Sequence, residues 1–291
     1  MIALEHFGYG FRKTGQQEKN ILVPRECSEP KNFVKFKGYA LLKDQYAALE
    51  EFCKQYSMTP KQMFSKKGTL EVENGLVIMI SSALNSISGT GRKLFIPKQL
   101  EYLQELDCSM NYLLEIVELP ENLQKLDCGD NQLAVLPKLP QHLKELHCNN
   151  NYLCELPELP AQLQSLHCRN NQLPALPKLP VQLQNLYCSI NHLRSLPELP
   201  AHLQKLFCGD NKLAALPELP AQLQQLYCHI NQLAALPELP DQLQELSCYD
   251  NPVMLVIRKD LLFLREVDCL NTKISSKTIA RLQKQGIKVI Y

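Results

Sequence analysis

The stretch LQSLHCRNNQLPALPKLPVQ, residues 163–182, decides the fold, because its pattern recurs along about half of the chain. Copies read L-x-x-L-x-C-x-x-N-x-L and mostly continue through L-P-x-L-P. The cysteine returns every twenty residues and once more after twenty-one, at Cys108, Cys128, Cys148, Cys168, Cys188, Cys208, Cys228, Cys248 and Cys269. A fixed period of this length is typical of stacked structural units that share one continuous core.

Within each copy, apolar and polar residues alternate, as in Leu166, His167, Cys168 and Arg169. This period of two predicts a short strand whose leucine and cysteine face inward, with neighbouring copies paired as a parallel sheet. The recurring prolines lack the N–H that a helix or inner strand uses, so short extended, PPII-like segments are expected on the convex side. The pattern predicts a leucine-rich-repeat solenoid whose eight strands, about 4.8 Å apart, form a curved sheet roughly 40 Å long.

One asparagine per repeat, from Asn111 to Asn251, lies where the chain leaves the strand. A buried amide at this place can satisfy backbone groups that the turn would otherwise leave without partners. We therefore interpret this row of asparagines as structural.

The repeat array needs caps, because an exposed terminal repeat would show its apolar core to water. We expect three regions: residues 1–96 with a small helical and hairpin α/β cap, residues 97–253 with the strict repeats, and residues 254–291 with a degenerate repeat and an α/β C-terminal cap. In the last region, Glu266 to Leu270 is predicted to be a strand and Ser275 to Gln285 a helix that Gly286 ends, before a final strand from Ile287 to Ile290.

The N-terminal region is less periodic. Tyr39 to Tyr56 is predicted to be an amphipathic helix, and Thr59-Pro60 carries the start signal of a second short helix. Leu70 to Ile80 contains Glu73-Asn74-Gly75 and is predicted to form a hairpin. Residues 1 to about 33 are expected to be loosely ordered.

Composition and charge limit the classes of partner and the compartment that we expect. The formal net charge is +1, but residues 98–250 contain 9 Lys/Arg against 18 Asp/Glu, so the body is acidic and the flanks are basic. An acidic face argues against nucleic acid and favours a protein partner with a basic segment.

The first twenty residues lack an apolar secretion signal, and the longest apolar stretch, residues 75–84, is too short to span a membrane. Most of the twelve cysteines occupy the core slot, which favours a reducing compartment.

The unit LPELPAQLQQLYCHINQL, residues 216–233, closely resembles the twenty-residue repeats of YopM and the IpaH-type effectors of bacterial pathogens. The resemblance covers about residues 97–253, with Cys in a slot that is commonly aliphatic in that family. The IpaH-type members add a C-terminal ubiquitin-ligase domain for which this sequence has no room, so the YopM-like members are the closer match. The resemblance implies a secreted virulence effector that a specialised secretion system delivers into the host cytoplasm, and a Legionella effector is one hypothesis.

The position before each repeat cysteine should point to the concave face. It holds, in order, Asp107, Asp127, His147, His167, Tyr187, Phe207, Tyr227 and Ser247. We expect the rings of Tyr187, Phe207 and Tyr227 to stack, with His229 and Tyr249 one column over. Because aromatic residues are enriched at interface hot spots, we interpret this patch as a partner-binding site; an ordinary sheet-face ladder is the alternative.

His147 and His167 should lie about 5 Å apart, with Asp127 beside them and Arg169 in the next column. Two His and an Asp could ligate a metal, but parallel side chains rarely converge on one ion and Arg169 opposes a cation. We therefore expect a polar contact surface and no metal or other cofactor. The His pair could make partner binding sensitive to pH near 6.5.

No catalytic site is expected. A nucleophilic cysteine needs a base and an accessible thiolate, whereas the repeat cysteines face the core. Cys154 replaces a small alanine of other repeats, and the surroundings of Cys27 and Cys53 are not set by the repeat. The sequence favours a monomeric, non-enzymatic protein-binding module. The alternatives are a structural protein that assembles with its own kind and an enzyme with its activity in residues 1–95.

Overall fold

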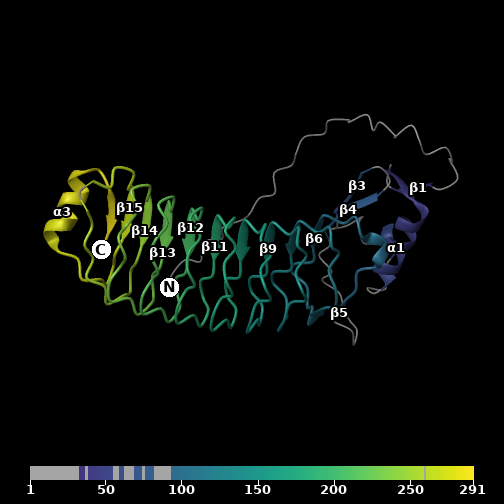
Figure 1. Ribbon diagram of the computed structural model, residues 1–291, viewed down its shortest axis with the longest axis horizontal. Coiled ribbons are helices and arrows are strands. Elements are labelled where there is room, and N and C mark those ends of the chain that lie inside the picture. Colours follow the sequence, from purple (N-terminus) through teal and green to yellow (C-terminus); the bar gives the residue numbers. More distant parts are fainter. Residues whose placement is uncertain are drawn as a thin grey trace.

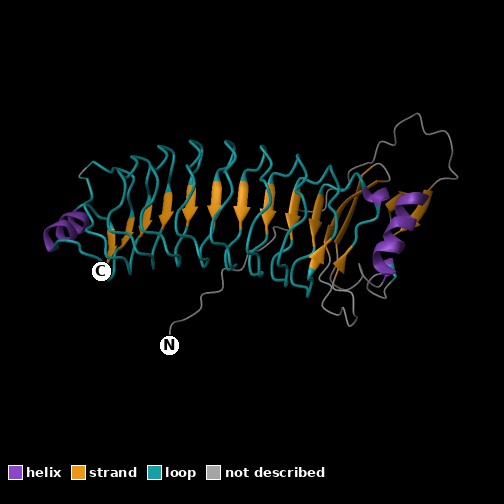
Figure 2. Ribbon diagram, turned by 60° about the horizontal axis from the view of Figure 1, so that its bottom comes forward, coloured by secondary structure: helices purple, strands orange, loops and turns teal. Residues whose placement is uncertain are grey.

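The protein is a β-solenoid in which short parallel strands lie side by side along one long inner face (Figures 1 and 2). The computed structural model describes residues 33–36, 39–54, 59–61, 69–73, 76–81, 93–258 and 260–291. Twelve of the described strands form one continuous sheet that runs from β16 at the C-terminal end to β3 at the N-terminal end. The leucine-rich-repeat solenoid that the sequence predicts is confirmed.

Each repeat contributes one three-residue strand to this sheet. These strands are β6 (Glu105–Asp107), β8 (Lys125–Asp127), β9 (Glu145–His147), β10 (Ser165–His167), β11 (Asn185–Tyr187), β12 (Lys205–Phe207), β13 (Gln225–Tyr227), β14 (Glu245–Ser247) and β15 (Glu266–Asp268). They pair in parallel with residues of equal repeat position side by side, as His167 with Tyr187. A row of side chains along the solenoid therefore follows directly from the twenty-residue period.

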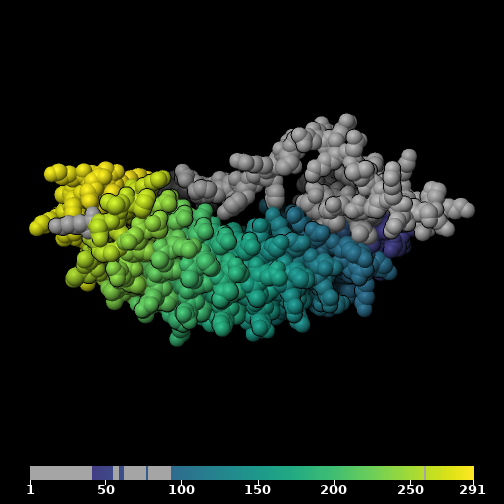
Figure 3. All heavy atoms as spheres, turned by 45° about the horizontal axis from the view of Figure 1, so that its top comes forward, coloured from purple at the N-terminus to yellow at the C-terminus, as the bar shows by residue number. Residues whose placement is uncertain are grey.

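The core is a stack of identical layers. In one repeat, Leu163, Leu166, Cys168 and Leu173 are fully buried. Between strands β10 and β11 the chain forms neither helix nor strand, and a turn in which the N–H of Leu183 bonds to the Pro180 oxygen leads into the next strand. The repeats consequently build an unbroken curved body, teal to yellow in Figure 3.

The asparagine row ties adjacent turns together. The side-chain N–H groups of Asn171 donate to the carbonyl oxygens of Cys148 and Cys168, 3.0 and 3.1 Å away. Its side-chain oxygen accepts the N–H of Leu153 at 3.0 Å. Equivalent bonds recur at the other repeats, so the structural interpretation of this row is confirmed.

The C-terminal end has the predicted elements. Strand β15 is followed by α3 (Ser276–Lys284) and by β16 (Lys288–Ile290), which pairs with β15 in parallel. The hydroxyl of Ser275 caps α3 by accepting the N–H of Thr278. Gly286 follows the helix with a φ of 79°, a left-handed conformation that glycine adopts at little cost.

The N-terminal end differs in part from expectation. Tyr39–Leu42 is strand β2 rather than helix, because it pairs antiparallel with β1 (Phe33–Phe36), and α1 spans only Lys43–Lys54. Pro60 and Lys61 are helical, as the start signal predicted. Residues 62–68, over which that short helix was expected to continue, and residues 1–32 lie outside the described residues.

The predicted hairpin is present and extends the repeat sheet. β3 (Thr69–Glu73) and β4 (Leu76–Ser81) pair antiparallel, and β4 pairs in parallel with β6. The buried Gln45 of α1 links these parts, because its amide N–H donates to the Gln99 oxygen beside η2 (Lys98–Leu100) and its oxygen accepts the N–H of Val77. On the other side of the solenoid, β5 (Lys93–Leu94) pairs in parallel with β7 (Glu115–Ile116). The first repeat is thus covered by its neighbouring segments.

Candidate protein-binding face

An aromatic ladder runs along the inner face of the sheet. Its five rings are those of His147, His167, Tyr187, Phe207 and Tyr227, one from each of the strands β9 to β13. Successive ring centroids lie 4.1, 4.1, 4.7 and 4.3 Å apart. The predicted row of Tyr187, Phe207 and Tyr227 is therefore present, with Phe207 and Tyr227 stacked and Tyr187 tilted by 31° against Phe207. Both histidines continue the row, His167 stacked on Tyr187 and His147 tilted by 39° against His167. All five side chains are half-buried, so their outer edges face solvent.

A second stack lies one column over. The rings of His229 and Tyr249 are nearly parallel, 3° apart in plane with centroids 4.6 Å apart. The His229 ring lies across Gly209, where an added Cβ would come within 2.5 Å of its Nε2 atom. The sequence analysis did not consider Gly209, although its slot holds Arg169 and Ser189 in the two preceding repeats. The glycine makes room for the histidine to lie flat on the sheet.

At the N-terminal end of the ladder, the carboxylates have hydrogen-bond or ion-pair partners within the chain. Asp107 accepts bonds from the N–H and hydroxyl of Ser109, at 3.0 and 2.7 Å. One Asp127 oxygen lies 3.6 Å from Nδ1 of His147, and Lys125 forms an ion pair with Glu145 at 3.4 Å. No group of His, Cys, Asp or Glu among the described residues is arranged to hold a metal ion.

The histidines do not support the simple expectation of titration near pH 6.5. Burial and the neighbouring His147 lower the pKa of His167 to about 3, against a smaller opposing effect of Asp127. Burial also lowers the pKa of His229. His167 is thus neutral throughout the physiological range, and the predicted pH switch is wrong for this residue. Arg169 lies in the adjacent column and is exposed, as predicted.

The C-terminal end of the ladder is acidic. The Tyr227 hydroxyl donates to a Glu245 oxygen at 2.5 Å, and burial together with this bond raises the pKa of Tyr227. Burial also raises the pKa of Tyr249, with further contributions from the carboxylates of Asp268, Asp250 and Asp210. Negative charge therefore gathers around the tyrosines at this end.

The repeat cysteines are core residues. All nine are buried, and burial raises the pKa of each thiol, to about 12 at Cys168. Cys53 is also buried, in α1, with its pKa raised to about 12, and Cys154 is exposed. Cys27 lies outside the described residues. Burial of the nine repeat thiols agrees with the expectation that they serve packing rather than nucleophilic chemistry.

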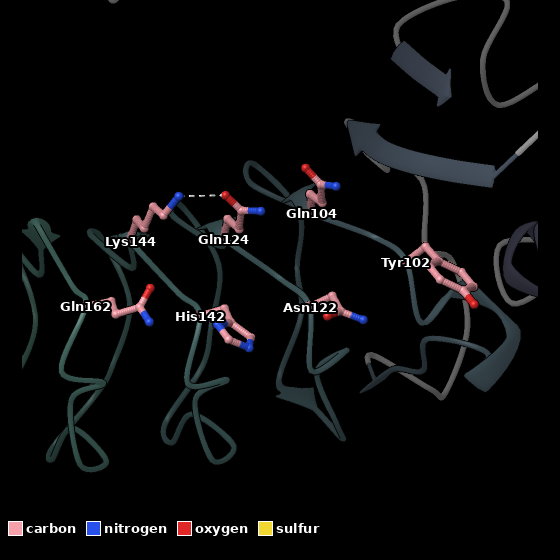
Figure 4. A pocket seen from close by; sticks show the side chains of 7 residues that line it. All are labelled: Tyr102, Gln104, Asn122, Gln124, His142, Lys144 and Gln162. Carbon is pink, nitrogen blue, oxygen red and sulfur yellow. Dashed lines mark hydrogen bonds between the residues drawn. The ribbon is translucent and has the colours of Figure 1, made fainter. Parts of the chain in front are cut away.

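A shallow polar groove lies where the chain enters the first strands, a feature that the sequence analysis missed. It has a volume of about 380 Å³ and is lined by Tyr102, Gln104, Asn122, Gln124, His142, Lys144 and Gln162. Figure 4 shows these side chains in two rows, with Lys144 bonded to Gln124 at 2.9 Å. The signal was the varied residue three positions before the start of each strand, where Tyr102, Asn122 and His142 replace one another.

Several solved structures of known proteins share this architecture. No family model and no curated protein matches the chain. Among solved structures, YopM from Yersinia enterocolitica is 29% identical over 69% of this chain and 52% of its own, with a TM-score of 0.55. YopM from Yersinia pestis is 29% identical over 67% of this chain and 60% of its own, with a TM-score of 0.58. A Shigella effector domain is 30% identical over 58% of this chain and 81% of its own, with a TM-score of 0.51.

The chain is a leucine-rich-repeat solenoid, a class of protein-binding module. Within that class it belongs with the leucine-rich-repeat domains of bacterial effectors such as YopM. It spans only 52% and 60% of the length of the two YopM chains. No helix in the described part of the chain is long and apolar enough to cross a membrane.

Proposed function

We propose that this protein is a non-enzymatic effector that binds a host protein on its concave face, and that the aromatic ladder is the contact site. The observation that carries the proposal is the run of five rings in successive contact, whose outer edges are presented to solvent on the sheet. Aromatic side chains on such a surface supply large contact area with little conformational entropy to lose, because stacking already fixes them.

The surroundings of the ladder favour a basic protein partner. Asp107 and Asp127 lie on its N-terminal side and Glu245 on its C-terminal side, while Arg169 lies in the adjacent column. Excess carboxylates on the repeat body repel the phosphates of nucleic acid and attract a segment rich in Lys or Arg. The likeness to YopM and the Shigella effector domain supports secretion into a host cell, where the protein would act as a monomeric adaptor.

The test is capture of partners from host-cell lysate by the full chain, followed by mass spectrometry. A triple variant, Tyr187→Ala, Phe207→Ala and Tyr227→Ala, removes the ladder centre. We expect it to lose the captured protein while circular dichroism and cooperative unfolding show an intact array. A double variant, Tyr112→Ala and Tyr152→Ala, removes two exposed rings from outside the ladder and should retain capture.

Three results would contradict the proposal. A partner captured equally by the wild type and the triple variant would place the contact site elsewhere. A molecular mass in light scattering that grows with concentration, together with no captured protein, would favour self-assembly. Turnover by an isolated N-terminal fragment would favour an enzyme in residues 1–95.

A further inference from the structure

We infer that the C-terminal end of the aromatic ladder binds an arginine side chain of the protein partner, with its guanidinium on Tyr249 between the carboxylates of Asp250 and Asp268. The inference rests on the proposed function and names the partner chemistry that this end of the concave face recognises. Three observations lead to it: the ring ladder stops, a second stack lies beside the interruption, and the aspartates around that stack form no ion pair within the described part of the chain.

The ladder stops at β14, where the row position is Ser247 instead of a ring. The next residue in the row is Asp268, because Ser247 pairs with Asp268 in register. Beside this interruption, His229 and Tyr249 form their own stack, and the Ser247 hydroxyl lies 3.4 Å from Nδ1 of His229. At β14 the row of rings therefore ends, and the half-buried ring of Tyr249 lies near the carboxylate of Asp268.

The aspartates here form no direct ion pair within the described part of the chain. Lys288 forms its ion pair with Glu266, at 2.9 Å, and no ion pair involves Asp210, Asp250 or Asp268. The other contacts of Asp250 and Asp268 are with neutral groups, the amide of Asn271 and the N–H of Leu270. Burial, with contributions from Glu266 and Asp250, raises the pKa of Asp268, and the opposing effects of the Leu270 N–H and the Lys288 ammonium do not cancel this rise.

At the opposite end of the ladder, carboxylates do have cationic or histidine neighbours. There Lys125 pairs with Glu145, and Asp127 lies beside His147. A guanidinium fits the C-terminal end better than an ammonium, because it is planar, stacks on aromatic rings and bonds carboxylates in pairs. A partner segment bound here would place its arginine over β14 and β15 and its apolar side chains along Phe207 and Tyr227.

The experiment follows the ¹³C-labelled tyrosine rings of the full chain by NMR during titration with the peptide acetyl-Leu-Gly-Arg-amide. Matched peptides carry citrulline, which is a neutral isostere, or lysine in place of arginine. We expect saturable shifts of the Tyr249 and Tyr227 signals with the arginine peptide and affinity about tenfold weaker for citrulline, because the charge-assisted bonds are lost. The double variant Asp250→Asn and Asp268→Asn should weaken arginine binding by about the same factor.

A charge-matched control, Glu155→Gln with Glu158→Gln, removes two carboxylates outside the strands and should bind like the wild type. Equal binding of citrulline or lysine, absence of a saturable shift, or unchanged binding by the aspartate variant would overturn the inference. Tyrosine shifts that depend on protein concentration without peptide would instead indicate a second copy of this chain on the face. If a partner from lysate requires the ladder rings but not Asp250 and Asp268, the proposed function stands and the arginine site does not.

Discussion

The two sides of each strand follow different rules. The inward side repeats the same residues, with Leu166, Cys168 and the nearby Asn171 returning in almost every turn. The outward side changes from strand to strand, from aspartate through histidine and aromatic rings to serine. A periodic core allows each turn to stack on the next, whereas the outward side is free to vary because it does not determine stacking. Stability should therefore be concentrated on the inward side and partner recognition on the outward side.

The largest effect is expected from the inward amides. Asn171→Ala removes the acceptor for the buried N–H of Leu153 and the donors to the Cys148 and Cys168 oxygens. Since buried backbone groups lose their partners, the free energy of unfolding should fall by about 3 kcal/mol, measured by urea denaturation. Gln172→Ala changes the adjacent exposed residue and should alter stability by less than about 0.5 kcal/mol. Equal losses in both variants would show that the amide row is not a main source of stability.

A smaller effect is expected from the histidine of the ladder. The pKa of His167 is lowered to about 3 in the folded chain and is near 6.5 when unfolded, so protonation favours the unfolded state. Its contribution to stability is complete above pH 6.5 and is lost progressively as the pH falls from 6.5 toward 3. The groups that face it are His147, Asp127, Tyr187 and the Ser165 hydroxyl, 3.1 Å from its Nε2 atom.

Urea denaturation at pH 7 and pH 5 measures this effect. The wild type should lose on the order of 1 kcal/mol more than His167→Gln over this interval, because glutamine does not titrate. The same pH dependence in both proteins would mean that other groups cause it. A stable, pH-independent ladder would then be a better description of the outward side.

The sequence predicted the periodic features well and the local exceptions poorly. Leu166 and Cys168 could be placed because alternation and period together determine which side of a strand is buried. Tyr39–Leu42 could not be assigned to a strand, because its residues also suit a helix and only its pairing with β1 decides between the two. The rings of Tyr187 and Phe207 were assigned to one row from the period alone.

The features of the face that depend on side-chain geometry were not predicted. His229 lies flat only because Gly209 has no Cβ, which requires knowledge of where the ring points. The neutral state of His167 depends on how deeply its neighbours bury it. The groove lined by Tyr102 and His142 depends on the path of the chain between turn and strand. A repeat therefore reveals its rows from sequence, whereas the packing within a row needs coordinates.

The smallest effect is expected from the hydroxyl of Tyr227. Tyr227→Phe removes the bond to Glu245 but keeps the ring that stacks on Phe207. Because this bond lies at a half-exposed surface, where water replaces it, the free energy of unfolding should fall by only about 0.5 kcal/mol. Ultraviolet titration gives an independent measurement, since the raised pKa of Tyr227 means that the variant lacks a phenol that ionises only at high pH. If Tyr227→Phe destabilised the chain as much as Asn171→Ala, the outward side would also hold the turns together, and stability and recognition could not be assigned to opposite sides of the strands.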